Sequence, residues 1–263
     1  MRLEVRKLCA GYGASPVLND ISFCAEGGER IAVLGPNGAG KTTLFRALLG
    51  FLPPISGEIL LDGKSLSVWS RRALAGKLAY IPQSAAPAFD HSVLDCVLMA
   101  KAGSLGVFSQ PTREDEKKAL SLLERLGIGS LAGRSCRRIS GGEAQLMLLA
   151  RALMQDARLL IMDEPTASLD VGNALRVTEC IRTLSREGYT VLFSTHDPNQ
   201  ALHGASRVLA LSGGGVLADG ASETVLSADT LRTLYGAELF VGQVETGRGA
   251  VPVCVPLQTE AKP

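Results

Sequence analysis

The sequence has no excess of one charge, no long apolar run and no grouped cysteines. Its 263 residues include 27 basic and 26 acidic side chains, a net charge of +1. This balance disfavours a protein that wraps nucleic acid, because such proteins usually carry a basic excess. No stretch reaches the roughly 18 unbroken apolar residues that a membrane-spanning helix requires. The six cysteines are scattered, without a Cys-x-x-Cys pair, and this spacing disfavours a zinc or redox site.

The first seven residues carry charges where a secretory signal would need its apolar segment, so we expect the chain to stay in the cytoplasm. Strand-like and helix-like patterns then alternate along the chain, which predicts an α/β protein with a largely parallel sheet. The expected strands lie at 3–8, 17–23, 30–34, 57–63, 78–81, 159–162 and 189–195, and the expected helices at 41–51, 142–154 and 174–186.

Residues 84–138 differ from the segments around them. A helical pattern covers 93–100, and Thr112 can cap a second helix through Asp115. Gly127 can end that second helix. We therefore expect a helical insert between two parts of the α/β core. The tail has a helical stretch at 230–235 and a strand-like stretch at 251–255, and residues 258–263 are expected to fray.

A glycine-rich loop lies between the apolar strand at 30–34 and the helix that follows. It matches the phosphate-binding pattern G-x-x-x-x-G-K-[ST] at every fixed position. Its backbone N–H groups and the helix N-terminus would hold phosphate, Lys41 would reach the β- and γ-phosphates, and Thr42 would ligate Mg²⁺. A plain glycine-rich turn would not need both Lys and Thr. The residues expected to contact ATP are Gly35, Pro36, Asn37, Gly38, Ala39, Gly40, Lys41, Thr42 and Thr43.

The strand at 159–162 ends in two carboxylates, Asp163 and Glu164. Ligands of open α/β sheets bind at this edge, so Asp163 is suited to hold Mg²⁺ through water and Glu164 to polarise an attacking water. The alternative is a strand that merely ends in polar residues. Likewise, the segment Ser140, Gly141, Gly142, Glu143 can be a capping box, a second phosphate site, or both.

Together these residues resemble the nucleotide-binding subunit of an ATP-binding cassette (ABC) transporter. The segment from Ser140 to Glu143 looks like the family signature Leu-Ser-Gly-Gly-Gln, with Ile139 and Glu143 as departures. The other matching elements occur in the family's order along residues 3–240. They are Tyr12, resembling the adenine-stacking aromatic; Gln83, resembling the loop glutamine that senses Mg²⁺ and the membrane partner; the 168–170 segment with Asp170, resembling the loop at the dimer interface; and His196, resembling the switch histidine. Each is weak alone, and the ordered set is specific.

The resemblance implies an α/β fold: a P-loop NTPase core with a mixed or parallel sheet, an N-terminal antiparallel β subdomain and a helical insert. An ATPase domain would cover 1–240, with its core at about 1–83 and 139–220, its helical part at 84–138, and a tail at 241–263. Lys41, Gln83, Glu164 and His196 would be catalytic, and Thr42, Gln83 and Asp163 would hold Mg²⁺. Two copies would pack head to tail, so that Ser140 to Glu143 of one copy close over the ATP of the other.

The same resemblance implies partners. The homodimer would power transmembrane permease subunits at the cytoplasmic face of a bacterial inner membrane, with a substrate-binding protein taking part indirectly and no nucleic acid. We hypothesise that a short permease helix docks in a cleft bordered by Gln83 and the helix around 92–100, near Asp95.

Segments 195–199, 169–173 and 94–100 resemble the importer branch that takes up iron-siderophores, haem or vitamin B12, and 134–139 lacks the Gly-Glu-rich element typical of exporters. Molybdate or zinc importers stay possible. A soluble ABC ATPase or a P-loop kinase is the rival class, and the kinase would not need the elements at Ser140, Asp170 and His196 together.

Overall fold

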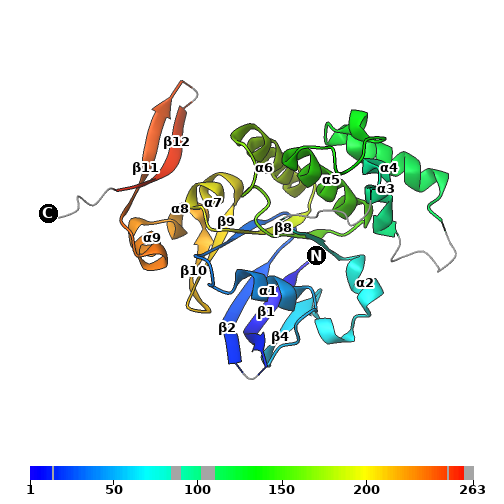
Figure 1. Cartoon of the computed structure of the whole chain (residues 1–263). Coiled ribbons are helices and arrows are strands. Elements are labelled where there is room, and N and C mark those ends of the chain that lie inside the picture. Colours follow the sequence, from blue (N-terminus) through cyan, green and yellow to red (C-terminus); the bar gives the residue numbers. More distant parts are fainter. Residues whose placement is uncertain (14, 84–89, 102–109, 248, 258–263) are drawn as a thin grey trace.

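A six-stranded sheet forms the centre of the computed structural model (Figure 1), which describes all residues except 14, 84–89, 102–109, 248 and 258–263. The strand order is β10-β9-β3-β8-β7-β6, and all neighbours are parallel except β10, which runs antiparallel to β9. The strands are β3 (Arg30–Leu34), β6 (Leu78–Ile81), β7 (Leu159–Met162), β8 (Thr190–Thr195), β9 (Arg207–Ser212) and β10 (Gly215–Ala221).

A smaller antiparallel sheet of order β2-β1-β4-β5 lies on one face of the central sheet (Figure 1). Its strands are β1 (Leu3–Tyr12), β2 (Ser15–Ala25), β4 (Ser56–Leu61) and β5 (Lys64–Ser65). Helix α1 (Lys41–Leu48) packs with this sheet, and both bury their apolar side chains in one cluster with Ile31 and Val33 of β3.

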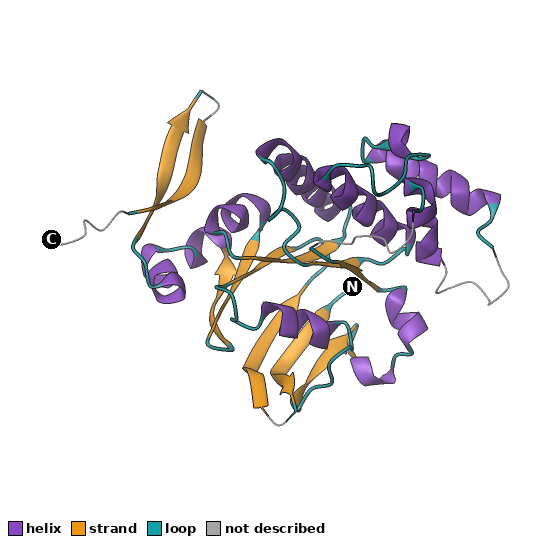
Figure 2. Cartoon of the chain, viewed as in Figure 1, coloured by secondary structure: helices purple, strands orange, loops and turns teal. Residues whose placement is uncertain are grey.

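Helices cover the opposite face of the central sheet (Figure 2). They are α3 (Val93–Leu98), α4 (Arg113–Arg125), α5 (Gly141–Met154), α6 (Val171–Arg186), α7 (Pro198–Gly204), α8 (Ser222–Val225) and α9 (Ala228–Tyr235). Shorter elements are α2 (Arg71–Ala75), η1 (Leu66–Val68), η2 (Met99–Lys101) and η3 (Gly129–Leu131). Ala32 and Leu34 of β3 point into the core under these helices, so successive residues of β3 alternate between two buried cores.

The sequence pattern predicted most helices and strands correctly. The strands expected at 30–34, 78–81 and 159–162 have the observed bounds of β3, β6 and β7. Thr112 and Asp115 cap α4 reciprocally, as predicted. Gly127, just beyond α4, has a φ of 72°, the left-handed conformation that ends helices. No helix in the described part of the chain is long and apolar enough to span a membrane.

The C-terminal tail forms a hairpin of its own. Strands β11 (Leu239–Thr246) and β12 (Gly249–Pro256) pair only with each other among the described strands, and they extend from the body of the molecule (Figure 1). The strand expected at 251–255 is confirmed as part of β12, whereas β11 was not anticipated. The expected frayed end at 258–263 lies outside the described residues.

Candidate nucleotide-binding site

The glycine loop joins the carboxyl end of β3 to the first turn of α1. A Cβ atom on Gly35 would lie 2.5 Å from the backbone oxygen of Leu211, so only glycine fits beside β9. Gly40 has a φ of 100° and its Cβ would lie 2.5 Å from Leu18 Cδ2, which again requires glycine. The sequence therefore folds this loop tightly against two neighbouring strands.

The N-terminus of α1 is open to a ligand. Gly40 occupies the N-cap position and provides no side-chain cap, and the first turn contains no acidic residue. Uncapped N–H groups with the positive end of the helix dipole attract anions. The Thr42 side chain is exposed at this end, whereas that of Thr43 is 7% exposed, so Thr43 can offer chiefly its backbone N–H.

Lys41 folds back over the loop. Its Nζ donates to the carbonyl oxygen of Gly35 at 2.6 Å and to that of Pro36 at 3.2 Å. Burial lowers the pKa of Lys41, and the nearby carboxylates of Glu164 and Asp163 act in the opposite direction. The ammonium is therefore poised at the loop, where the phosphates of a nucleotide would replace its carbonyl partners.

Two carboxylates lie at the carboxyl end of β7, beside the end of β8. Ser194 Oγ donates to Asp163 Oδ1 at 2.6 Å and accepts from the backbone N–H of Glu164 at 2.9 Å. Glu164 has a φ of 43°, an uncommon value for a non-glycine residue, and this hydrogen bond helps to hold it. Glu164 Oε1 lies 3.0 Å from His196 Nδ1. The structure thus brings Asp163, Glu164 and His196 together next to Lys41.

Sequence reasoning missed Ser194 and Tyr80. Ser194 is 0% exposed and ties the two carboxylates to β8, and the Tyr80 hydroxyl donates to Asp163 Oδ2 at 3.4 Å. Burial and the Asp163 charge raise the pKa of Tyr80. A serine directly after the apolar residues Val191 to Phe193 of a buried strand was the available signal, because a buried hydroxyl needs a partner.

Ser140 begins α5 with a complete capping box. The backbone N–H of Glu143 donates to Ser140 Oγ at 3.3 Å, and the backbone N–H of Ser140 donates to Glu143 Oε2 at 2.7 Å. These bonds from Ser140 lower the pKa of Glu143. The capping interpretation of this segment is therefore confirmed. Ser140 and Gly141 are exposed, so the same turn can also contact a ligand.

Asp170 begins α6 next to the start of α5. Its Oδ1 accepts from the backbone N–H of Asn173 at 2.9 Å, which lowers the pKa of Asp170, and its Oδ2 accepts from Asn173 Nδ2 at 2.7 Å. A Cβ on Gly142 would lie 2.2 Å from Asn173 Cγ. The Ser140 segment and the Asp170 segment therefore form one continuous surface.

That surface is separate from the phosphate loop within one chain. The charged groups that act on Lys41 are Glu164 and Asp163, whereas those that act most on Glu143 are Arg134 and Arg176. Helix α1, which follows the phosphate loop, and helix α5, which follows Ser140, pack on opposite faces of the central sheet (Figure 1). Among the described residues, no hydrogen bond or ion pair links 35–43 with 140–143. The structure does not bring the two candidate phosphate sites together in one copy.

Tyr12 lies beside α1, and Gln83 follows β6 at one edge of the central sheet. Tyr12, at the end of β1, is 50% exposed, and its hydroxyl accepts from Arg46 Nη1 of α1 at 2.7 Å. An exposed ring beside α1 is available for stacking on a base. Gln83 is exposed just after β6, the strand next to β7.

Comparison with known proteins gives one consistent family. The family model for the ABC transporter matches residues 18–167. The chain is 40% identical over 235 residues to an uncharacterized ABC transporter ATP-binding protein of Haemophilus influenzae, covering 89% of each protein. It is 31% identical over 257 residues to the ferric enterobactin transport ATP-binding protein of Escherichia coli, covering 97% of this chain and 94% of that one.

A solved structure, described as an inward-facing conformation of a putative metal-chelate type ABC transporter, superposes with a TM-score of 0.87. The two chains are 32% identical, and the match covers 97% of each. The P-loop fold, with its mixed sheet and antiparallel N-terminal part, agrees with this match. The chain therefore belongs to the family of ABC transporter ATP-binding subunits, which bind and hydrolyse ATP.

Proposed function

We propose that this chain is the ATP-hydrolysing subunit of an importer for an iron-siderophore, haem or cobalamin-type substrate. The proposed hydrolysis of ATP is supported by a cluster of charged and polar side chains at one edge of the sheet. They are Lys41, Asp163, Glu164 and His196. The substrate class rests on relatives, among them a probable iron chelatin transport ATP-binding protein of Helicobacter pylori, 36% identical over 91% of this chain.

The phosphate loop and the N-terminus of α1 bind the phosphates in this proposal, and Tyr12 stacks on the adenine. Thr42, Gln83 and Asp163 offer a hydroxyl, an amide oxygen and a carboxylate, the hard oxygen donors that suit Mg²⁺. When bound there, Mg²⁺ would neutralise phosphate charge. Lys41 exchanges its loop carbonyls for phosphate oxygens, and thereby stabilises the charge that develops during transfer.

Glu164 polarises the attacking water in this proposal. Its contact with His196 at 3.0 Å places a polar ring beside the carboxylate, where it can orient the water and the γ-phosphate. Ser194 fixes both Asp163 and the backbone of Glu164, so the carboxylates keep a defined separation.

We propose that a second copy completes the site with Ser140, Gly141, Gly142 and Glu143 acting in trans. The separation of this segment from Lys41 within one chain supports a composite site. Beside it, Val171 and Leu175 at the start of α6 are 78% and 65% exposed. Apolar side chains next to Asp170 suit a surface that is covered when two copies close.

We propose that the permease docks in a groove of about 710 Å³ lined by residues between Ala47 and Tyr80 and by Gln155. This groove differs from the cleft beside Gln83 and Asp95 hypothesised from the sequence, because none of the described residues that line it belongs to α3; that earlier hypothesis stays a prediction. Phe51, Leu66, Trp69 and Tyr80 contribute to its wall, and Phe51 is 66% exposed. The groove reaches Tyr80, just before Gln83.

The proposal also covers location and domain limits. The dimer would sit at the cytoplasmic face of a bacterial inner membrane, with 1–240 as the ATPase domain, 84–138 as its helical part and 241–263 as a tail. Uptake of labelled ferric siderophore, haem, cobalamin, molybdate and zinc, with and without this chain, would identify the substrate. A zinc transport system relative in Treponema pallidum, 36% identical, keeps metal ions among the candidates.

The direct test of the ATPase proposal is Glu164→Gln. The amide keeps the shape of the side chain but cannot act as a base, so we expect ATP binding to persist and kcat to fall by about 10²–10⁴-fold. ATP should then hold the variant as a dimer in size-exclusion chromatography. The matched control is Glu187→Gln, because Glu187 is a surface carboxylate that pairs with Arg125. Normal turnover by a monomeric Glu164→Gln protein would refute the proposal.

A further inference from the structure

The C-terminal hairpin contacts the turn that carries His196. Asn199, in the first turn of α7, uses both ends of its side-chain amide on one residue of β12. Its Nδ2 donates to the carbonyl oxygen of Cys254 at 2.9 Å, and the backbone N–H of Cys254 donates to its Oδ1 at 2.8 Å. Cys254 is 4% exposed, so this pair of hydrogen bonds is largely protected from water.

A second contact reaches the histidine itself. The hydroxyl of Tyr235, the last residue of α9, donates to the backbone carbonyl oxygen of His196 at 2.9 Å. Burial raises the pKa of Tyr235, so the hydroxyl keeps its proton and remains a donor. Tyr235 immediately precedes the chain segment that leads to the hairpin. Tyr235 of α9 and Cys254 of the hairpin therefore both bind the turn 196–199 from outside the central sheet.

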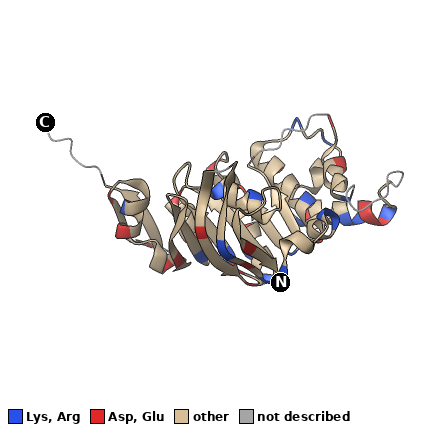
Figure 3. Cartoon of the chain, turned by 90° about the horizontal axis from the view of Figure 1, so that it is seen from below, with Lys and Arg blue, Asp and Glu red and all other residues tan. Residues whose placement is uncertain are grey.

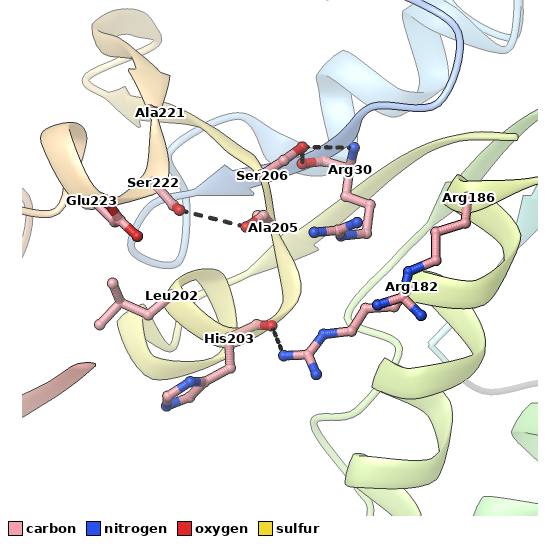
Figure 4. A pocket seen from close by; sticks show the side chains of 10 residues that line it. All are labelled: Arg30, Arg182, Arg186, Leu202, His203, Ala205, Ser206, Ala221, Ser222 and Glu223. Carbon is pink, nitrogen blue, oxygen red and sulfur yellow. Dashed lines mark hydrogen bonds between the residues drawn. The ribbon is translucent and has the colours of Figure 1, made fainter. Parts of the chain in front are cut away.

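The other end of α7 is also fixed. Arg182 Nη2 donates to the carbonyl oxygen of His203, and Arg30 Nε donates to that of Gly204 at 2.9 Å. Figure 4 shows both arginines beside Arg186 in a hollow of about 520 Å³ at the amino edge of β3 and β9. These bonds satisfy terminal carbonyls of α7, so the arginines have a structural role there. Helix α7 is thus tied at both ends.

The His196 ring itself has little support. Its side chain is 52% exposed, and its hydrogen-bond contact is Glu164, the group it must help to align. The position of the ring is therefore set mainly by the backbone of the turn 195–198. Thr195 Oγ1 accepts from the backbone N–H of Asp197 at 3.0 Å on the core side, and the Tyr235 hydroxyl binds the His196 carbonyl oxygen on the outer side.

We propose that Tyr235 and Asn199 are positioning residues for ATP hydrolysis, and that α9 and the C-terminal hairpin together hold His196 at its working distance from Glu164. This inference rests on the proposed roles of His196 and Glu164. It gives α9 and the hairpin a function in the reaction, and it predicts that a change at Tyr235, 39 residues from His196 along the chain, alters kcat without altering how ATP is bound.

The experiment compares Tyr235→Phe and Asn199→Ala with the unchanged full-length protein. Tyr235→Phe removes one hydrogen bond, which corresponds to about a fivefold loss of kcat, while the KM for ATP stays within about twofold. Asn199→Ala leaves the backbone N–H and carbonyl oxygen of Cys254 without the Asn199 amide and should lower kcat about tenfold or more. Asn199→Asp keeps the acceptor for the Cys254 N–H but turns a carboxylate oxygen toward the Cys254 carbonyl oxygen, so its kcat should fall at least as far as that of Asn199→Ala.

Tyr189→Phe is the matched control. Tyr189 lies at the start of β8, against Arg158 rather than His196, and the same loss of a hydroxyl there should leave kcat unchanged. Each change is repeated in a His196→Ala background and followed by single-turnover hydrolysis. If Tyr235 acts through the histidine, Tyr235→Phe has no further effect there, because the two changes remove one shared interaction.

The outcomes distinguish the inferred role of Tyr235 from the proposed role of His196. A loss of kcat by Tyr235→Phe that disappears in His196→Ala supports the inference. An unchanged kcat in Tyr235→Phe, while His196→Ala slows hydrolysis to a rate that is still measurable, overturns the inference and leaves the proposed function intact. Equal losses with and without His196 would make Tyr235 a merely structural residue and also overturn it. Normal hydrolysis by His196→Ala overturns the proposed role of the histidine.

Discussion

Gly142 gives a sharp test of how the start of α5 is packed. A Cβ at this position would lie 2.2 Å from Cγ, 2.5 Å from Oδ1 and 2.6 Å from Cβ of Asn173. The Asn173 side chain cannot swing away at no cost, because its Nδ2 is hydrogen-bonded to Asp170. Overpacking of this severity costs about 3 kcal/mol. The higher helix propensity of alanine offsets about 1 kcal/mol of this cost, so the free energy of unfolding should fall by about 2 kcal/mol.

The neighbouring Gly141 is the matched control. A Cβ there would lie 3.6 Å from Leu169 Cδ2, an ordinary contact, in the same helical turn. Gly141→Ala should therefore keep or slightly raise the melting temperature. Gly142→Ala should lower it by about 4–8 °C, since about 2 kcal/mol shifts Tm by that amount in a protein of this size.

Thermal unfolding followed by circular dichroism measures both variants in the absence of nucleotide. Asn173→Gly removes the opposing side chain, so in that background Gly142→Ala should cost little or nothing. Equal melting temperatures for Gly141→Ala and Gly142→Ala would refute the packing argument, and so would a full loss of Tm that persists beside Asn173→Gly.

Two further predictions concern the polar groups of the site. Ser194→Ala removes the hydrogen bonds that fix Asp163 and Glu164 and should lower kcat about tenfold in a phosphate-release assay, whereas Ser206→Ala, at the opposite edge of the sheet, should not. Because the pKa of Glu143 is lowered in the folded state, its ionised form stabilises the protein at neutral pH, and this contribution is lost as the pH falls through that pKa. The difference in Tm between the protein and Glu143→Gln should thus shrink on acidification from pH about 7 to about 3, and a constant difference would contradict the assignment.

Local patterns made much of the candidate site predictable. The phosphate loop, the capping boxes at Thr112 and Ser140, and the carboxylates after β7 each depend on residues within a few positions of one another. Glycine, capping and strand-end chemistry act over that range, so the sequence alone identifies them. The resemblance to a family then linked segments that no local rule connects.

The remaining features depend on contacts between distant segments. Asn199 meets Cys254 across 55 residues of sequence, and Ser194 meets Asp163 across 31. No periodicity in the sequence encodes such pairs. Strand β11 was missed because Gly242 interrupts its pattern and because β12, its partner, supplies its backbone hydrogen bonds. The predictions that Tyr12 stacks on adenine, that Gln83 helps to hold Mg²⁺ and that Asp170 lies at the dimer interface stay predictions, as do the roles of Lys41, Glu164 and His196 in hydrolysis.

The position of β3 has a consequence for how this protein can move. This strand hydrogen-bonds to β8 on one side and β9 on the other, and its residues from Ile31 to Leu34 are at most 1% exposed on both faces. Opening it requires the loss of two cores at once, so we expect its amide protons to exchange with solvent only on global unfolding. The phosphate loop is therefore anchored to the stiffest part of the molecule. Movements that follow ATP binding and release must arise in the helical layer and at the surfaces around it, while the loop serves as a fixed reference.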